Sequence, residues 1–167
     1  RRTESEFADL QSMIDTAATP APAGENVNPN GARFAALRDK NSDFIGWISI
    51  DGTNLDFPVM YAPDNKDFYL RHDFNKAYSV YGVPYLDEQT TLGVNAESDN
   101  LIIYGHNMKN GSMFKDIVRY KDPSYFKEHQ YFSIYTPERE IRLKAVSCYY
   151  GEAKPIVRKT RFKSQEA

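Results

Sequence analysis

The sequence predicts a mainly β domain with peripheral helices, and two observations carry this prediction. Twelve Tyr and ten Phe stand among Val and Ile residues, side chains that favour strands with one buried face. From residue 44 onward the chain also divides into short apolar runs separated by turn-forming residues, whereas helical spacing is found mainly before that point. We therefore expect N-terminal helices followed by one sheet-forming domain.

The N-terminal part is expected to form two helices and a linker. Apolar residues recur every three or four positions across residues 3–17, as on one face of a helix. Residues 19–31 are rich in Pro, Gly and Asn, which ends that periodicity, and a second short helix is expected at 34–38. We assign residues 1–40 to these helices and the linker, and residues 41–167 to the main domain.

Six runs in the main domain have the pattern of strands. The run 100–104 gives the strongest signal for a buried strand. Two of the runs contain a proline, so we expect these at sheet edges, at bulges or at strand ends. Asp51 and Gly52 should form the turn between the first two runs. The predicted strands are 46–50, 55–60, 81–86, 100–104, 131–135 and 141–150, and small helices are predicted at 112–120 and 123–129.

Composition excludes several classes of function. A formal net charge of −2 leaves no basic surface for nucleic acid. One cysteine excludes an internal disulfide framework and a Cys-rich zinc site, and the acidic residues lack the spacing of a calcium loop. We expect neither a metal nor a cofactor. No run reaches the ~18 apolar residues of a membrane helix, so a membrane anchor is expected outside this chain.

His106 has the best setting for catalysis among the three histidines. It follows the apolar run that ends at Tyr104, beside Gly105 and several polar residues. The end of a rigid strand is where a loop presents a reactive side chain. The alternative is a strand-end histidine that only bonds a loop. His72 and His129 stand among charged residues and are expected to be solvated on the surface.

Cys148 is the one thiol of the sequence, and pairing with His106 would let the imidazole take its proton. Cys148 lies within the predicted strand 141–150, however, next to Tyr149 and without a glycine or helix start to expose or acidify it. Buried cysteines mostly behave as small hydrophobic residues. We therefore expect Cys148 in the core, with a Cys-His hydrolase as an alternative.

Four sequence blocks follow one another along the chain: GWISIDGT at 46–53, FPV at 57–59, DFYL at 67–70 and IYGHNMKNGSMF at 103–114. In this order they are similar to the blocks of class B sortases. The last block is the most diagnostic, because it carries His106 within the run YGHNM. The resemblance covers about residues 34–151.

The resemblance implies a sortase-like β-barrel with peripheral and extra N-terminal helices. Sortases are cysteine transpeptidases anchored on the outer face of the cell membrane of Gram-positive bacteria. They cleave a sorting motif on a surface protein and join its new carboxyl end to an amine. The implied partners are a sorting-signal peptide and a cell-wall peptidoglycan precursor or other amine acceptor. His106 is expected to be general acid for the leaving amine and general base for the incoming one.

Two other groups of the family's mechanism have no match in this sequence. The family's nucleophile is a cysteine in a Thr-Leu-x-Thr-Cys-like motif at the end of a later strand, and its oxyanion partner is an arginine on the following strand. Neither motif occurs, and Cys148 lies before the place where the first should come. We expect that the chain stops short of the C-terminal part of the barrel and is inactive as it stands.

The resemblance also implies contacts to the sorting peptide. Class B enzymes hold this peptide partly with the helix after the second strand, where Asn65, Tyr69 and Leu70 lie in this sequence. Leu70 fits a plain core position equally well. A second class of function stays open, namely a non-catalytic β-barrel module that binds a peptide or cell-wall component and in which His106 is structural.

Overall fold

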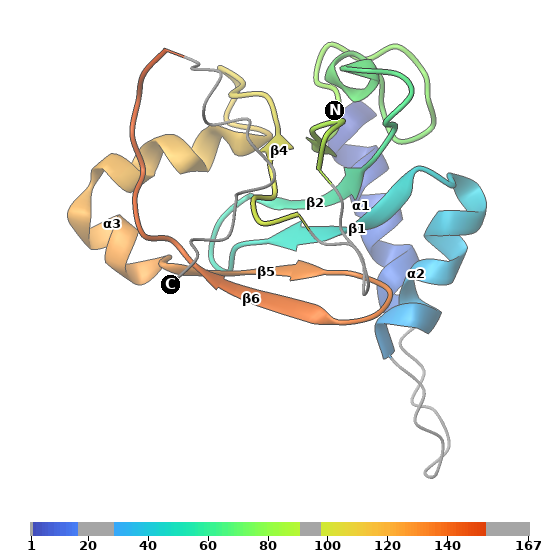
Figure 1. Ribbon diagram of the computed structural model, residues 1–167, viewed down its shortest axis with the longest axis horizontal. Coiled ribbons are helices and arrows are strands. Elements are labelled where there is room, and N and C mark those ends of the chain that lie inside the picture. Colours follow the sequence, from blue (N-terminus) through green and yellow to red (C-terminus); the bar gives the residue numbers. More distant parts are fainter. Residues whose placement is uncertain (1, 17–28, 91–97, 153–167) are drawn as a thin grey trace, which may run out of the picture.

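One curled sheet of six strands forms the centre of the molecule (Figure 1). The computed structural model describes residues 2–16, 29–90 and 98–152. The strand order is β4-β3-β2-β1-β5-β6, and every neighbouring pair is antiparallel except β2 and β3. The mainly β prediction is confirmed. The strands are β1 (Phe44–Ser49), β2 (Asp56–Met60), β3 (Tyr85–Leu86), β4 (Ile103–Tyr104), β5 (Tyr131–Tyr135) and β6 (Glu140–Lys144).

Short helices surround this sheet. The first predicted helix is confirmed as α1, and the second, α2, begins earlier than residue 34. Most of the predicted linker lies outside the described residues. The helices are α1 (Arg2–Thr16), α2 (Pro29–Lys40), α3 (Pro123–Glu128) and the 3₁₀ helices η1 (Phe68–Leu70) and η2 (Phe114–Lys121).

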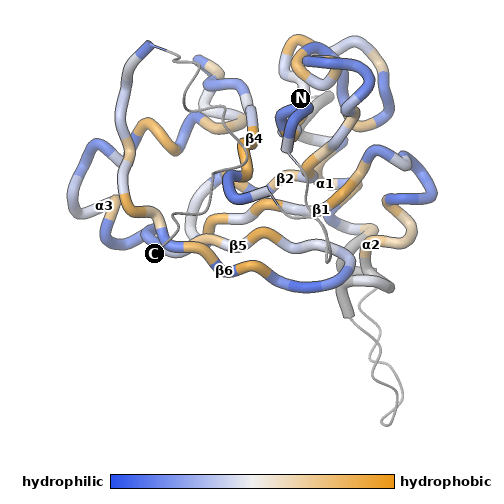
Figure 2. Tube along the Cα trace, viewed as in Figure 1, coloured by the Kyte–Doolittle hydropathy of each residue, from blue (hydrophilic) through white to orange (hydrophobic). Residues whose placement is uncertain are grey.

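The sheet separates two hydrophobic clusters. On one face, Leu10 of α1 and Leu37 of α2 are buried against Phe44. On the other face, Val59 and Ile134 belong to a cluster that η2 and α3 cover only in part. Figure 2 shows the hydrophobic stretches along β1, β2 and β5 between these two sides. The N-terminal helices therefore share a core with the sheet.

Pro58 lies in an interior strand and not at a sheet edge, but the expected irregularity is present beside it, since the register shifts between Phe44 and Gly46, opposite Met60 and Val59. β2 lies between β1 and β3, and Pro58 pairs with Trp47 of β1. The backbone N–H of Met60 points toward β3 and donates to Pro84 O at 2.9 Å. The nitrogen of Pro58 faces the same way, because alternate strand residues point their N–H groups to one side. Since β3 pairs only at Met60, no ladder bond is lost at Pro58.

Three predicted strands are shorter in the structure. The runs 81–86 and 100–104 contribute two residues each, because Gly82 takes a positive φ of 58° and β3 offers β4 a short partner. The run 141–150 ends its pairing at Lys144, opposite Tyr131, where β5 begins. The residues beyond have no strand to pair with in the described part of the chain.

The two small helices predicted after His106 are present. The first, expected at residues 112–120, is the 3₁₀ helix η2, which Met113 precedes with a φ of 59°. Asp122 caps the next helix as predicted, since its Oδ1 accepts from the backbone N–H groups of Ser124 at 2.8 Å and Tyr125 at 3.0 Å.

Candidate functional site

His106 lies two residues after the end of β4, half-buried at the start of a loop. Its Nε2 is 2.8 Å from the carbonyl oxygen of Leu70, which belongs to η1. Its own carbonyl oxygen accepts from the backbone N–H of Phe114, at the start of η2, at 2.9 Å. The backbone and the ring are thus held from two different elements. This is the rigid presentation that a catalytic imidazole requires.

The residues predicted to contact a peptide occupy three different environments. Asn65 is exposed on the loop before η1. Tyr69 is 1% exposed, and its hydroxyl accepts from Asn41 Nδ2 at 2.9 Å and donates to Asp43 Oδ2 at 2.7 Å. Leu70 is half-buried and packs against the cluster under α1 and α2. The structure therefore brings Leu70 to His106, while Tyr69 lies in the core and Asn65 faces solvent.

Cys148 lies neither in a strand nor in the core, so the expectation of a buried cysteine is wrong. β6 ends at Lys144, and the thiol is exposed on the extended segment that follows. Its Sγ approaches the carbonyl oxygen of Ile117 in η2 at 3.7 Å. Within the described residues, no hydrogen bond joins Cys148 to His106. The Cys-His hydrolase alternative thus lacks the contact that it requires.

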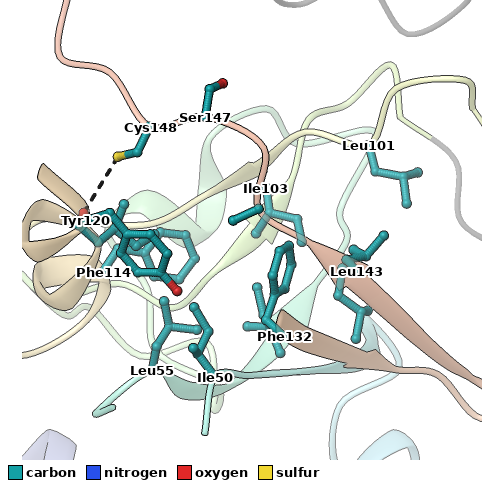
Figure 3. A pocket seen from close by; sticks show the side chains of 14 residues that line it. Ile50, Leu55, Leu101, Ile103, Phe114, Tyr120, Phe132, Leu143, Ser147 and Cys148 are labelled. Carbon is teal, nitrogen blue, oxygen red and sulfur yellow. Dashed lines mark hydrogen bonds between the residues drawn. The ribbon is translucent and has the colours of Figure 1, made fainter. Parts of the chain in front are cut away.

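A large apolar hollow opens on the face of the sheet opposite α1 and α2. It measures about 310 Å³, and side chains from β1, β5, β6 and η2 line it. Figure 3 shows Ile50 and Leu55 at its floor and Cys148 at its rim beside η2. Alternation in β6 contributes Leu143 to this surface and turns Lys144 outward. The hollow is the inner face of the curled sheet.

A second pocket of about 510 Å³ lies on the other side of Phe114 and Ile117, which border both spaces. Gly105 and Asn107, the neighbours of His106, line it together with Cys148. The pocket is large enough for a ligand of peptide size, and His106 joins the two residues that line it without lining it itself. The sequence did not predict either pocket, although the apolar alternation of residues 141–145 was a signal for the first.

Tyr120 lines the hollow and is itself buried. Burial, followed by the proximity of Tyr125, raises the pKa of the Tyr120 hydroxyl to about 12. This hydroxyl donates to the carbonyl oxygen of His129 at 2.6 Å. The tyrosine therefore stays protonated at neutral pH and supplies a fixed hydrogen-bond donor at the base of η2.

The other two histidines are less exposed than predicted, and the expectation of solvated rings is wrong. His72 stacks on Phe68 with ring centroids 3.9 Å apart, and its Nδ1 lies 2.7 Å from Phe68 O. The His129 side chain is 10% exposed, with its Nδ1 2.9 Å from Asp51 O. Aromatic neighbours and turn carbonyls hold both rings, which the charged residues around them in the sequence did not reveal.

Two absences apply to the described residues. No group of three or more His, Cys, Asp or Glu side chains is arranged there to hold a metal ion. No helix in these ranges has both the length and the apolar character needed to cross a membrane.

Comparison with known proteins identifies sortase B proteins as relatives of this chain. No family model matches the chain. Sortase B of Listeria monocytogenes is 38% identical over 128 residues, which are 74% of this chain and 50% of that protein. Sortase B of Staphylococcus aureus is 28% identical over 85% of this chain and 56% of that protein. The chain thus spans about half the length of these curated relatives.

Solved structures show the same fold. A mutant form of Clostridium perfringens sortase B has a TM-score of 0.70 and 32% identity, covering 84% of this chain and 63% of that one. A Staphylococcus aureus sortase B-substrate complex has a TM-score of 0.73 and 24% identity, covering 86% and 62%. A sortase B complexed with triglycine has a TM-score of 0.73 and 24% identity, and the match covers 86% of this chain and 63% of that one. The chain belongs to the sortase B family, and the matches cover roughly half to two thirds of these members.

Proposed function

We propose that this chain is the histidine-bearing part of a class B sortase-type cysteine transpeptidase. One observation carries the proposal: His106 is held at a strand end by Leu70 and Phe114, beside a pocket that its two neighbours line. Homology to sortase B supplies the reaction class, because a relative of 38% identity spans the residues around this site.

The proposed chemistry assigns His106 two proton transfers. A cysteine thiolate attacks the scissile carbonyl carbon of the sorting peptide, and His106 gives a proton to the departing amine as the acyl-enzyme thioester forms. An incoming amine then attacks the thioester, gives its proton to His106, and releases the thiolate as the new amide forms. The histidine ends in the protonated form in which it began.

We assign the nucleophile to a residue outside these 167 residues. Cys148 is exposed on an extended segment and bonds Ile117 O, and among the described residues no hydrogen bond joins it to His106. The family's cysteine and arginine motifs, which follow later strands, are not part of the sequence. By the proposal, this chain on its own does not form product.

The proposed partners are a sorting-signal peptide and an amine acceptor from the cell wall or a pilin. The relatives support both classes, since one sortase B structure holds a substrate and another holds triglycine. We place the protein on the outer face of the cell membrane, anchored by a segment outside this chain. Asn65 and Leu70 are the proposed peptide contacts of the described surface.

The test compares this chain with the protein encoded by its complete reading frame. Each is incubated with a library of sorting-signal peptides and triglycine, and ligated products are detected by mass spectrometry. Product from the longer protein alone is the expected result. If neither forms product while this chain binds a peptide from the library, the protein is a binding module and the transpeptidase proposal fails.

A further inference from the structure

The three histidines differ in which ring nitrogen faces a backbone carbonyl. His106 presents Nε2 to Leu70 O at 2.8 Å. His72 presents Nδ1 to Phe68 O at 2.7 Å, and His129 presents Nδ1 to Asp51 O at 2.9 Å. A carbonyl oxygen only accepts hydrogen bonds, so the nitrogen that faces it must carry a hydrogen. The neutral form of His106 is therefore the Nε2–H tautomer, opposite to that of the other two.

The Leu70 carbonyl is itself held in place by its neighbours. Tyr69, the preceding residue, is 1% exposed, and the carbonyl oxygen of Tyr69 accepts from Val83 N at 3.0 Å. Gly82 covers the same peptide with a φ of 58°, and a Cβ there would lie 2.4 Å from Tyr69 O and 2.7 Å from Leu70 O. Only glycine allows the segment to approach this closely in this conformation.

We propose that the Leu70 carbonyl, kept in position by Gly82, fixes His106 as the Nε2–H tautomer and makes Nδ1 the nitrogen that gives and takes the proton. Gly82 is then a positioning residue that acts through Leu70. The same bond stays in place in the protonated ring, where both nitrogens carry hydrogen, so the ring does not turn between the two transfers. The role of Nδ1 in proton transfer rests on the proposed function, whereas the assignment of the Nε2–H tautomer does not.

The tautomer is measured on this chain by NMR, with ¹⁵N-labelled histidine and ¹³C′-labelled leucine. At about pH 8.5 imidazole rings are neutral. His106 should show a protonated Nε2, and His72 and His129 a protonated Nδ1, as internal references. An unconstrained ring also favours Nε2–H, so the decisive signal is the scalar coupling between His106 Nε2 and Leu70 C′ across their hydrogen bond. An Nδ1–H ring at His106, or the absence of this coupling in the wild-type chain, overturns the proposal.

Gly82→Ala and Gly111→Ala form a matched pair. Both residues have a positive φ, 58° and 90°, but a Cβ at Gly111 meets no atom within 4 Å. Gly82→Ala should abolish the coupling while Gly111→Ala keeps it; equal spectra would remove Gly82 from the proposal. If Gly82→Ala does not fold, the wild-type coupling still decides the tautomer.

The reaction provides a second readout in the protein encoded by the complete reading frame. Gly82→Ala should lower kcat about tenfold or more, because a misplaced acid slows the chemical step. Gly111→Ala should keep wild-type kcat. A wild-type kcat in folded Gly82→Ala contradicts the positioning role. If the coupling is present while His106→Ala remains fully active, the tautomer stands and the proposed function fails.

Discussion

The hydroxyl of Tyr69 donates to Asp43 Oδ2 at 2.7 Å and so joins η1 to the residue that precedes β1. Asn41 Nδ2 donates to the same hydroxyl at 2.9 Å. Burial, followed by the bond to Asp43, raises the pKa of Tyr69 above that of a free tyrosine, so the hydroxyl remains a donor at neutral pH. Through the Tyr69 side chain, Asn41 and Asp43 hold η1, whose Leu70 contacts His106.

Removing that hydroxyl should destabilise the fold. Tyr69→Phe removes the hydrogen bonds of this hydroxyl to Asn41 and Asp43, although Asn41 keeps Phe74 O and Asp43 keeps Lys76 as partners. We therefore expect a loss of about 1–2 kcal/mol in the free energy of unfolding. Tyr78→Phe is the matched control, because Tyr78 is 72% exposed, and should change stability by less than about 0.5 kcal/mol. Urea denaturation measures both, and equal losses would refute a structural role for the Tyr69 hydroxyl.

Glu6 should make stability fall as the pH rises. Burial, followed by repulsion from Asp73, raises the pKa of Glu6 above 4.5 in the folded protein. As the pH rises past 4.5, Glu6 loses its proton in the unfolded chain before it does so in the folded protein. The folded state therefore becomes less stable relative to the unfolded state until the pH passes the raised pKa of Glu6. Glu6→Gln keeps the acceptor for Asn75 Nδ2 and removes this effect.

The measurement is the free energy of unfolding between pH 4 and pH 7. The advantage of Glu6→Gln over wild type should grow with pH, starting near the ordinary pKa of a glutamate. Glu138→Gln, at an exposed turn position, controls for the loss of one negative charge. A constant difference between Glu6→Gln and wild type over this range would contradict the assignment.

Two leucines that line the same hollow should differ in cost. Leu55 is 0% exposed, and Leu55→Ala should remove about 2–5 kcal/mol from the free energy of unfolding. Leu101 is half-buried at the open side, so Leu101→Ala should cost no more than about 1 kcal/mol. Equal costs would mean that the hollow is closed in solution.

Cys148 should react with a thiol reagent in the native state. The thiol is exposed, and so are Val146 at 85% and Tyr150 at 100% around it. We expect labelling of the folded chain at a rate close to that of the unfolded chain. Cys148→Ser supplies the blank, since the sequence has no other cysteine. Strong protection in the native state would restore the core position that the sequence suggested.

Local pattern predicted the helices and the central strands because their periodicity is set by contacts close in sequence. Trp47 and Val59 belong to short apolar runs of the sequence, and both are buried in the structure. The length of a strand depends on its partner, which no local pattern contains. The run 141–150 has apolar residues at positions 141, 143 and 145, yet its pairing stops at Lys144 because β5 begins opposite it.

The candidate site was predictable only where the sequence itself carries the signal. The block around His106 identified the residue, but its contact with Leu70 joins positions 36 apart in sequence. Cys148 was placed wrongly because its environment follows from the end of the ladder and from Ile117, far away in the chain. The first pocket arises from the curvature of the sheet, and the second lies between η2 and the segment that follows β6. A residue pattern specifies neither.

The most direct test of the account is transpeptidation by the protein encoded by the complete reading frame, measured for His106→Ala and Cys148→Ala side by side. His106→Ala should lower kcat/KM by about 100-fold or more while the fold is kept, as expected for loss of the general acid and base. Cys148→Ala should retain wild-type activity. Near-wild-type turnover by His106→Ala, or abolition of turnover by Cys148→Ala, would contradict the account.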